Sequence, residues 1–394
     1  MISVKEAKNI ILEKVNPLSA LMLPLTTVRG LVLASDLQAS TDIPNFRQSS
    51  MDGYAIQYGE TRSSFEIVGE MAAGSAKQFS ILPNQAARIF TGAPLPLGAD
   101  TVVMQEKVRV EQGSILIDDP NLCCGQNVRE KGAEIQTGRL AMEKGTILSP
   151  AALGFLAGIG IAALRVIPRP SVTIILTGNE LQEPGHDLEF GQVYEANGVM
   201  LTAVLKQAGV EVIQIRRASD NLEYLCEVLE KSLQESDVVL LTGGVSVGDY
   251  DFVVAATKHC RISQHFHKVK QKPGKPLFFG TKYNKVVFGL PGNPSSVLSC
   301  FYQYVLPALG KLFNKNLSLK TVQARLSHDY KKSPGLTHFL KGSLNGNQAT
   351  PLQGQESFKL KSFAQAGCLI ELEETKADYL AGDEVKVHLI PLCY

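Results

Sequence analysis

The sequence predicts a multidomain α/β plus β protein. We expect a central doubly wound α/β domain with a parallel sheet, a β-rich domain, a helical and extended N-terminal domain and a small C-terminal β domain. The chain has 394 residues and is too long for one ordinary hydrophobic core. Strand-like and helix-like runs alternate over residues 171–315, as in a parallel sheet covered by helices on both faces. Short β-rich runs separated by Gly, Pro and Asn fill residues 45–138, and short strands return after residue 318.

The composition excludes several classes of protein. It is 44% hydrophobic and 20% charged with a net charge of +1, which is typical of a globular chain and argues against a general nucleic-acid surface. The longest apolar stretches, such as residues 153–164, fall short of the roughly 20 residues of a membrane span, and the first residues do not form a signal peptide. Seven cysteines without a CxxC pair indicate neither a zinc site nor a disulfide framework. We therefore expect a cytoplasmic protein without nucleic-acid or membrane partners.

Two helices are predicted outside the alternating region. Residues 1–23 have the apolar spacing of an amphipathic helix that Pro17 interrupts. Residues 149–164 predict a second helix, with Ser149 as its cap and Pro150 in its first turn. The resulting domains are an N-terminal linking domain at 1–44 plus 139–167, an inserted β-rich domain at 45–138, the α/β domain at 168–316 and the C-terminal β domain at 317–394.

Within the α/β region, each apolar strand precedes a helix or a turn. The expected strands are 172–178, 210–215, 237–243, 277–280 and 285–289, and the expected helices are 196–209, 220–236, 250–259 and 295–310. Asp220 opens one of these helices with Glu223 three residues later, which is the pattern of a capping box. That structural role is sufficient to explain Asp220 from the residues alone.

Three polar loops follow strands of this region, at residues 177–181, 242–251 and 289–296. In a parallel sheet their strands end at the same edge, where ligands bind. The loop TGGVSVGDYD at 242–251 has the glycine spacing of a Walker A phosphate loop, but Asp249 and Tyr250 replace the Lys and Ser or Thr of that motif. Its glycines let backbone amides approach an anion closely, whereas the cation that holds a nucleotide's terminal phosphates is missing.

The acidic residues of these loops suit a hard divalent cation. Asp249, Asp251 and Glu180 could hold Mg²⁺ together with phosphate oxygens of a substrate. The alternative is that the two aspartates only cap and charge the next helix, a contribution of about 1 kcal/mol. Three glycines and two acids at one strand end favour a site.

Four lysines lie near one turn at residues 268–276, in a protein that is otherwise almost neutral. Their charges fit a polyanionic small ligand, although a solvated charge run is the more common explanation of such a pattern. Pro273 and Pro276 stiffen the turn and favour a site. The loop at 289–296 brackets Asn293 with Gly and Pro before a helix, and it is either an anion site or a rigid turn.

Eight motifs in register resemble the molybdopterin molybdenumtransferases, the MoeA family, whose animal relative is the E domain of gephyrin. The motifs are SSMDGYA, TGAPLPLGADTVVMQE, GQNVREKGAEI, TGNEL, TGGVSVGDYD, KPGKP, GLPGNPSS and LQGQESFKLKSFAQAG. The resemblance implies an elongated homodimer of four-domain subunits. It also implies a Mg²⁺-dependent insertion of molybdenum from molybdate into adenylated molybdopterin, with release of AMP. The active cleft would lie between the α/β domain of one subunit and the β-rich domain of its partner.

The resemblance assigns roles to residues that match the family motifs. Catalytic residues would be Asp52 and Thr91 from the partner subunit, the acids Glu180, Asp220 and Asp251, and the lysines Lys268 and Lys272. Substrate-binding residues would be Gly243, Gly244, Ser246, Gly248, Asp249, Lys275, Pro291, Gly292, Asn293, Pro294 and Ser362. Glu180, Asp249 and Asp251 would be the Mg²⁺ ligands. In this interpretation the acids hold the metal on the pyrophosphate and the lysines neutralise molybdate and phosphate oxygens.

Three positions depart from the usual family pattern: Asn179 replaces an Asp, Glu134 replaces an Asp, and Val254 replaces a Lys. They motivate an alternative in which the chain binds or delivers molybdopterin without transferring molybdenum. A scaffold for other biosynthetic proteins is a further alternative, and the molybdopterin adenylyltransferase would be a natural partner. A nucleotide hydrolase is disfavoured by the missing Walker lysine.

Overall fold

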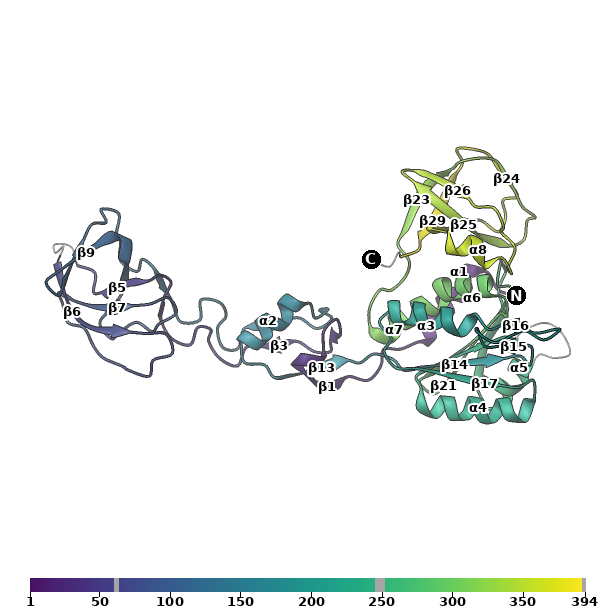
Figure 1. Ribbon diagram of the computed structural model, residues 1–394, viewed down its shortest axis with the longest axis horizontal. Coiled ribbons are helices and arrows are strands. Elements are labelled where there is room, and N and C mark those ends of the chain that lie inside the picture. The colour runs from purple at the N-terminus through teal and green to yellow at the C-terminus, as the bar shows by residue number, and fades with distance from the viewer. Residues whose placement is uncertain (60–63, 245–251, 392–394) are drawn as a thin grey trace. The chain divides into compact units, whose positions relative to one another are not determined.

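The computed structural model describes residues 1–59, 64–244 and 252–391 (Figure 1). The chain forms two compact units, one of Met1–Leu21 with Ile167–Tyr394 and the other of Met22–Val166. The first unit contains the α/β domain and the C-terminal β domain. The second contains the β-rich domain and a short linking region.

The α/β domain is built on a six-stranded sheet with the strand order β17-β14-β18-β22-β21-β19. Its strands are β14 (Val172–Thr177), β17 (Ile213–Ala218), β18 (Val238–Thr242), β19 (Ser263–Lys268), β21 (Pro276–Lys282) and β22 (Lys285–Leu290). The first four in spatial order are parallel. The two at the other edge are antiparallel. β21 and β22 are joined by only two residues, too few for the crossover that a parallel pair requires.

Helices cover both faces of this sheet, as the sequence predicts (Figure 1). α3 (Asn197–Gln207), α6 (Pro294–Cys300) and α7 (Leu306–Phe313) lie on one face, and α4 (Leu222–Glu235) and α5 (Phe252–His259) on the other. Alternate residues of β14 separate the two cores, since Ile174 packs with Leu205 of α3 whereas Ile175 packs with Leu229 of α4. Burial of both faces explains why these strands are apolar throughout.

The N-terminal helix α1 (Val4–Lys14) belongs to the same core. Ser3 and Glu6 form a capping box, with the Glu6 backbone N–H donating to Ser3 Oγ at 3.2 Å and Ser3 N–H donating to Glu6 Oε2 at 2.8 Å. Its apolar face contacts the helices of the α/β domain. The helix predicted at 295–310 is continuous from α6 to α7 but contains a π-helical segment, η3 (Phe301–Val305).

The C-terminal domain is a sheet that closes on itself. Its strands are β23 (Thr321–Leu326), β25 (Thr337–Asn345), β26 (Gln348–Pro351), β27 (Cys368–Leu372) and β29 (Glu384–Leu389). β25 pairs with both β26 and β27, and β23 and β29 complete the ring. A sixth, two-residue strand, β20 (Gln271–Lys272), comes from the α/β domain and pairs with β25. The lysine-rich turn is therefore attached to the C-terminal sheet.

The second unit contains a six-stranded sheet with the order β8-β5-β7-β6-β10-β9. These strands are β5 (Gly53–Ile56), β6 (Ser64–Met71), β7 (Gln85–Ile89), β8 (Thr101–Met104), β9 (Val108–Glu111) and β10 (Ser114–Ile117). Its linking region holds α2 (Pro150–Gly158), which begins at Pro150 with Ser149 as cap. The prediction that α2 extends to 164 is wrong, because Gly160 adopts φ +81° and the chain then enters strand β13 (Ala163–Ile167).

The remaining elements are short. They are β1 (Leu21–Pro24), η1 (Leu25–Thr27), β2 (Val32–Leu33), β3 (Leu37–Gln38), β4 (Gln48–Ser49), η2 (Gln105–Lys107), β11 (Val128–Arg129), β12 (Leu140–Met142), β15 (Leu181–Gln182), β16 (Val193–Tyr194), β24 (Tyr330–Lys331), α8 (Leu360–Ala364) and β28 (Asp378–Tyr379). Within the described ranges, no helix is long and apolar enough to cross a membrane.

Candidate functional site

Three strand ends meet at one edge of the α/β sheet, as the sequence predicts. β14, β18 and β22 are parallel neighbours, so the loops that follow them lie side by side. The Thr177 hydroxyl donates to the Thr242 carbonyl oxygen at 3.0 Å, and Gly243 N–H donates to the Leu290 carbonyl oxygen at 3.3 Å. These hydrogen bonds fasten the three loops to one another where each strand ends.

The first two glycines of the central loop are required by this packing. Gly243 and Gly244 have φ values of +85° and +62°, which favour glycine. A Cβ on Gly243 would stand 2.8 Å from the Thr177 carbonyl oxygen. The other predicted residues of this loop lie outside the described residues: Ser246, Gly248, Asp249 and Asp251.

Asp220 faces the loop after β14 instead of capping α4. The helix cap is Asn221, whose Oδ1 accepts from Tyr224 N–H at 2.9 Å, so the predicted capping box of Asp220 with Glu223 is wrong by one residue. Asp220 Oδ2 accepts from Asn179 N–H at 3.3 Å, and Asn179 Oδ1 accepts from Asp220 N–H at 3.4 Å. This reciprocal pair brings a carboxylate from the end of β17 beside the neighbouring loop, where the sequence alone gave it only a structural role.

Glu180 lies in the same loop and is exposed. Its carboxylate folds back over Gly178, where an added Cβ would approach Glu180 Oε2 to 2.6 Å. Carboxylate oxygens are the ligands that Mg²⁺ prefers, so Glu180 and Asp220 fit a metal at this edge chemically. Among the described residues no three His, Cys, Asp or Glu side chains form a group that could hold a metal ion, and the other two predicted ligands are outside those residues.

Two buried polar residues at this edge were not predicted. The carboxylate of Glu195, 6% exposed, accepts from Gly198 N–H at 2.8 Å at the start of α3. Asn197 Nδ2 donates to the Gly292 carbonyl oxygen at 2.9 Å, while Asn197 Oδ1 has no partner within the described part of the chain. In the sequence, Glu195 and Asn197 stand directly before an apolar helical segment. Polar residues at such a position are equally well explained by the start of a helix, so they did not indicate a site.

The two predicted lysines lie at the junction with the C-terminal domain. Lys268 ends β19 and Lys272 lies in β20, opposite His338 of β25. Lys275 is exposed in the turn that follows, and its carbonyl oxygen accepts from Val269 N–H at 3.0 Å. The turn is tightly packed, because a Cβ on Gly274 would stand 2.5 Å from Cys300 Sγ.

A pocket of about 630 Å³ adjoins Lys272 and is lined by several basic side chains. They are Lys272, Lys331, Lys332 and His338. Burial, then the charges of Lys332 and Lys272, lower the pKa of His338 from its ordinary value to about 4, and burial also lowers the pKa of Lys332. The imidazole is therefore neutral near pH 7, and the lysines supply the positive charge of this wall.

One loop of the C-terminal domain, residues 352–359, forms another wall of this pocket. Ser362, a predicted binding residue, is buried and donates to the carbonyl oxygens of Gly354 at 2.7 Å and Lys359 at 3.0 Å. In the same loop Ser357 Oγ accepts from Asn293 Nδ2 at 3.1 Å. The hydrogen bond between Asn293 and Ser357 thus connects the predicted loop after β22 to the basic pocket. Ser362 stabilises the pocket wall through its two hydrogen bonds to loop carbonyl oxygens.

The predicted prolines of the loop after β22 have different positions. Pro291 is buried, whereas Pro294 is the first residue of α6. Gly292 and Asn293, between them, are exposed.

In the other unit, Asp52 and Thr91 contact each other. Asp52 Oδ1 accepts from both the N–H and the hydroxyl of Thr91, each at 2.7 Å. These hydrogen bonds, backbone first, lower the pKa of Asp52, and the charge of Arg88 adds to them. Asp52 and Thr91, which the resemblance assigns to the cleft of a partner subunit, are therefore held together by hydrogen bonds to an ionised carboxylate.

Three family models together match the β-rich unit, the α/β domain and the closed C-terminal sheet, and they define a multidomain protein of the MoeA type. The model of the MoeA N-terminal region (domain I and II) matches residues 2–160. That of a probable molybdopterin binding domain matches 173–311, and that of the MoeA C-terminal region (domain IV) matches 323–390. The chain belongs to the MoeA family of molybdopterin molybdenumtransferases.

Individual relatives agree over nearly the whole length. A molybdopterin molybdenumtransferase of Staphylococcus epidermidis is 35% identical over 98% of this chain and 95% of its own, and one of Staphylococcus aureus is 32% identical over the same shares. A crystal structure of a molybdopterin biosynthesis MoeA protein from Pyrococcus horikoshii superposes with a TM-score of 0.83 at 31% identity, covering 99% of both chains. These findings confirm the predicted family and fold class, and they associate the chain with molybdenum cofactor biosynthesis.

Proposed function

We propose that this chain inserts molybdenum from molybdate into adenylated molybdopterin and releases AMP in a Mg²⁺-dependent reaction. The observation that carries the proposal is the link between the two predicted binding regions. The basic pocket at Lys272 adjoins the sheet edge through the hydrogen bond between Asn293 and Ser357. An oxyanion and a pterin phosphate could therefore be held by neighbouring parts of one unit.

The basic pocket would bind molybdate as a substrate. Molybdate is a small dianion, and lysine ammonium groups neutralise such charge while donating hydrogen bonds. Lys272 and Lys332 supply two of these charges, and neutral His338 can donate one N–H without adding a third. The carboxylate of Glu356, which also lines the pocket, would limit the net charge of the site.

The sheet edge would bind the adenylated molybdopterin. The backbone at Gly244 can approach a phosphate closely because no side chain intervenes, whereas the Gly243 N–H already donates to the Leu290 carbonyl oxygen. Glu180 and Asp220 would hold Mg²⁺ together with Asp249 and Asp251, and the bound ion would neutralise charge on the pyrophosphate. Asn197 Oδ1, a buried acceptor, would receive a hydrogen bond from the pterin. Catalysis would rest on positioning and charge stabilisation, without a covalent intermediate.

The second unit would contribute Asp52 and Thr91 to the site of a partner subunit. This assignment gives a cytoplasmic homodimer with its active cleft between subunits, four domains in each subunit, and the molybdopterin adenylyltransferase as supplier of the substrate. The two hydrogen bonds that Thr91 donates to Asp52 support it, because they keep the carboxylate ionised and oriented.

The test is an anaerobic assay of AMP release from the protein with bound adenylated molybdopterin. We expect release only when both molybdate and Mg²⁺ are present, and at least a tenfold loss in Lys272→Ala, because one charge–oxyanion hydrogen bond is worth about 1.5–3 kcal/mol. Lys206→Ala, an exposed lysine of α3, is the matched control and should release AMP normally. Tight pterin binding without AMP release in the unaltered protein would refute the transferase and support the carrier alternative.

A further inference from the structure

A small cavity lies apart from the basic pocket, between α1, η3 and the C-terminal sheet. It has a volume of about 120 Å³, and its polar lining includes Lys8, Gln303, Ser318, Thr321 and His388. Water in the liquid occupies about 30 Å³ per molecule, so the cavity has room for a few waters or one small oxyanion. None of these five residues belongs to the site proposed above.

Gln303 lines this cavity, and its side-chain amide contains a buried donor that lacks a partner among the described residues. Gln303 is only 3% exposed, and its side-chain oxygen Oε1 accepts a hydrogen bond from the Lys8 ammonium at 2.6 Å. That contact fixes the amide orientation, because an ammonium can only donate. Gln303 Nε2 is left without a partner among the residues that the structure describes. Buried amide donors normally have an acceptor, and an unmet one costs about 1–3 kcal/mol.

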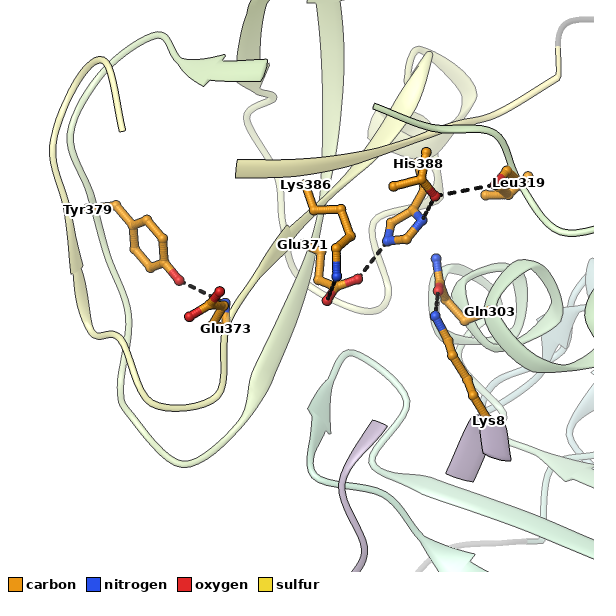
Figure 2. A network of polar contacts seen from close by, with 9 residues as sticks. Lys8, Gln303, Leu319, Glu371, Glu373, Tyr379, Lys386 and His388 are labelled. Atoms are coloured by element: carbon orange, nitrogen blue, oxygen red, sulfur yellow. Dashed lines mark hydrogen bonds and ion pairs between the residues drawn. The ribbon is translucent and has the colours of Figure 1, made fainter. Parts of the chain in front are cut away.

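Lys8 adds a positive charge beside this donor, and the nearby carboxylate is already engaged. Figure 2 shows Glu371 between Lys386 and His388, with Lys8 directed to Gln303. Glu371 Oε1 pairs with Lys386 Nζ at 3.1 Å, and its Oε2 pairs with His388 Nε2 at 2.7 Å. Both carboxylate oxygens of Glu371 are therefore engaged with groups other than Gln303.

The Thr321 hydroxyl, which also lines the cavity, has partners of its own. Thr321 Oγ1 lies 3.1 Å from His388 Nδ1 and donates to the Leu319 carbonyl oxygen at 3.4 Å. The π-helical segment η3 is what places Gln303 here, since it shifts the side-chain register relative to α6 and α7. Such π segments inside α-helices occur frequently at functional sites.

We propose that this cavity is a binding site for one small oxyanion, held by Gln303 Nε2 and the Lys8 ammonium. The ligand chemistry is an acceptor oxygen with negative charge, which either a carboxylate or a tetrahedral inorganic anion supplies. The site lies one residue from Tyr304, whose hydroxyl donates to Gln271 Oε1, and Gln271 adjoins Lys272. An anion here would therefore stabilise the helix segment that supports the lysine turn.

The test titrates the full-length protein with acetate, phosphate and sulfate in separate calorimetric experiments at constant ionic strength. Lys272→Ala protein serves as the background, so that anion binding in the basic pocket is weakened and contributes less to the heat. We expect one equivalent of anion to bind, with a dissociation constant of about 1 mM or below. Tighter binding of acetate would identify a carboxylate as the type of ligand. Tighter binding of phosphate or sulfate would identify a tetrahedral inorganic anion.

Gln303→Glu is the decisive variant. It keeps the shape and the contact with Lys8 but replaces the donor by a negative charge, so binding should weaken at least tenfold while the melting temperature is maintained. Lys8→Met should weaken binding similarly, whereas Lys5→Met, an exposed lysine of the same helix, should not. Failure of all three anions to bind, or affinity unchanged in Gln303→Glu and Lys8→Met, would overturn the proposal. Neither result depends on transferase activity.

Discussion

At the scale of single residues, the neutral state of His338 is the clearest electrostatic feature of the basic pocket. Burial, with the charges of Lys332 and Lys272, brings its pKa to about 4 from an ordinary 6.5. The unfolded chain takes up this proton as pH falls below about 6.5, whereas the folded protein takes it up only near pH 4. His338 therefore destabilises the folded protein increasingly as the pH falls from about 6.5 to about 4.

His338→Gln should remove this part of the pH dependence. We expect the free energy of unfolding of the unaltered protein to fall relative to the variant between pH 6.5 and 4, by at most about 3 kcal/mol. Urea denaturation at pH 7 and pH 4.5 measures both values. Parallel losses in the two proteins would contradict a depressed pKa at this position.

At the scale of elements, the loop 352–359 keeps its shape through one buried lysine. Lys341 is 2% exposed, and its ammonium donates to the carbonyl oxygens of Glu356 at 3.2 Å and Lys359 at 3.1 Å. Gln355 completes the support, because its side chain bonds both the N–H and the carbonyl oxygen of Lys341. The wall of the basic pocket therefore rests on a side chain that points away from solvent.

Lys341→Met should loosen this wall while keeping the length of the side chain. The Glu356 carbonyl oxygen would lose the ammonium donor and the Lys359 carbonyl oxygen would keep only Ser362 Oγ, at a cost of about 1–3 kcal/mol in the free energy of unfolding. Chemical denaturation checks the stability, with the exposed Lys361→Met as the matched control. A variant as stable as the control would show that the ammonium contributes nothing to the loop.

At the scale of the whole molecule, the proposed site needs residues from two copies of the chain. Asp52 lies in one compact unit and Lys272 in the other, and the proposed cleft takes one from each subunit. Asp52→Ala and Lys272→Ala proteins should each lose at least tenfold in AMP release. Dissociated, mixed and reassociated, they should regain about a quarter of the unaltered activity, because half of the dimers would be mixed and each would contain one intact site. AMP release measures the recovery, and none would argue for a site within one subunit.

The sequence predicted the parts of the fold that depend on local patterns. Apolar runs located β14, β18 and β22, and glycine- and proline-rich loops located the sheet edge that they share. It could not predict contacts between distant segments: the pairing of Lys272 with His338, and the closing of the C-terminal sheet, join residues far apart in the chain. Asp220 illustrates the same limit, since its neighbour Asn179 lies in the loop after another strand, β14.

The two-residue strand β20 has a consequence for how such proteins can be recombined. Its backbone belongs to the α/β region in sequence and to the C-terminal sheet in hydrogen bonding. A graft that exchanged the C-terminal sheet alone would leave β25 facing a foreign β20 and would break the wall that carries Lys272. The two domains should therefore be exchanged together, and chimaeras should be joined outside the unit of Met1–Leu21 and Ile167–Tyr394.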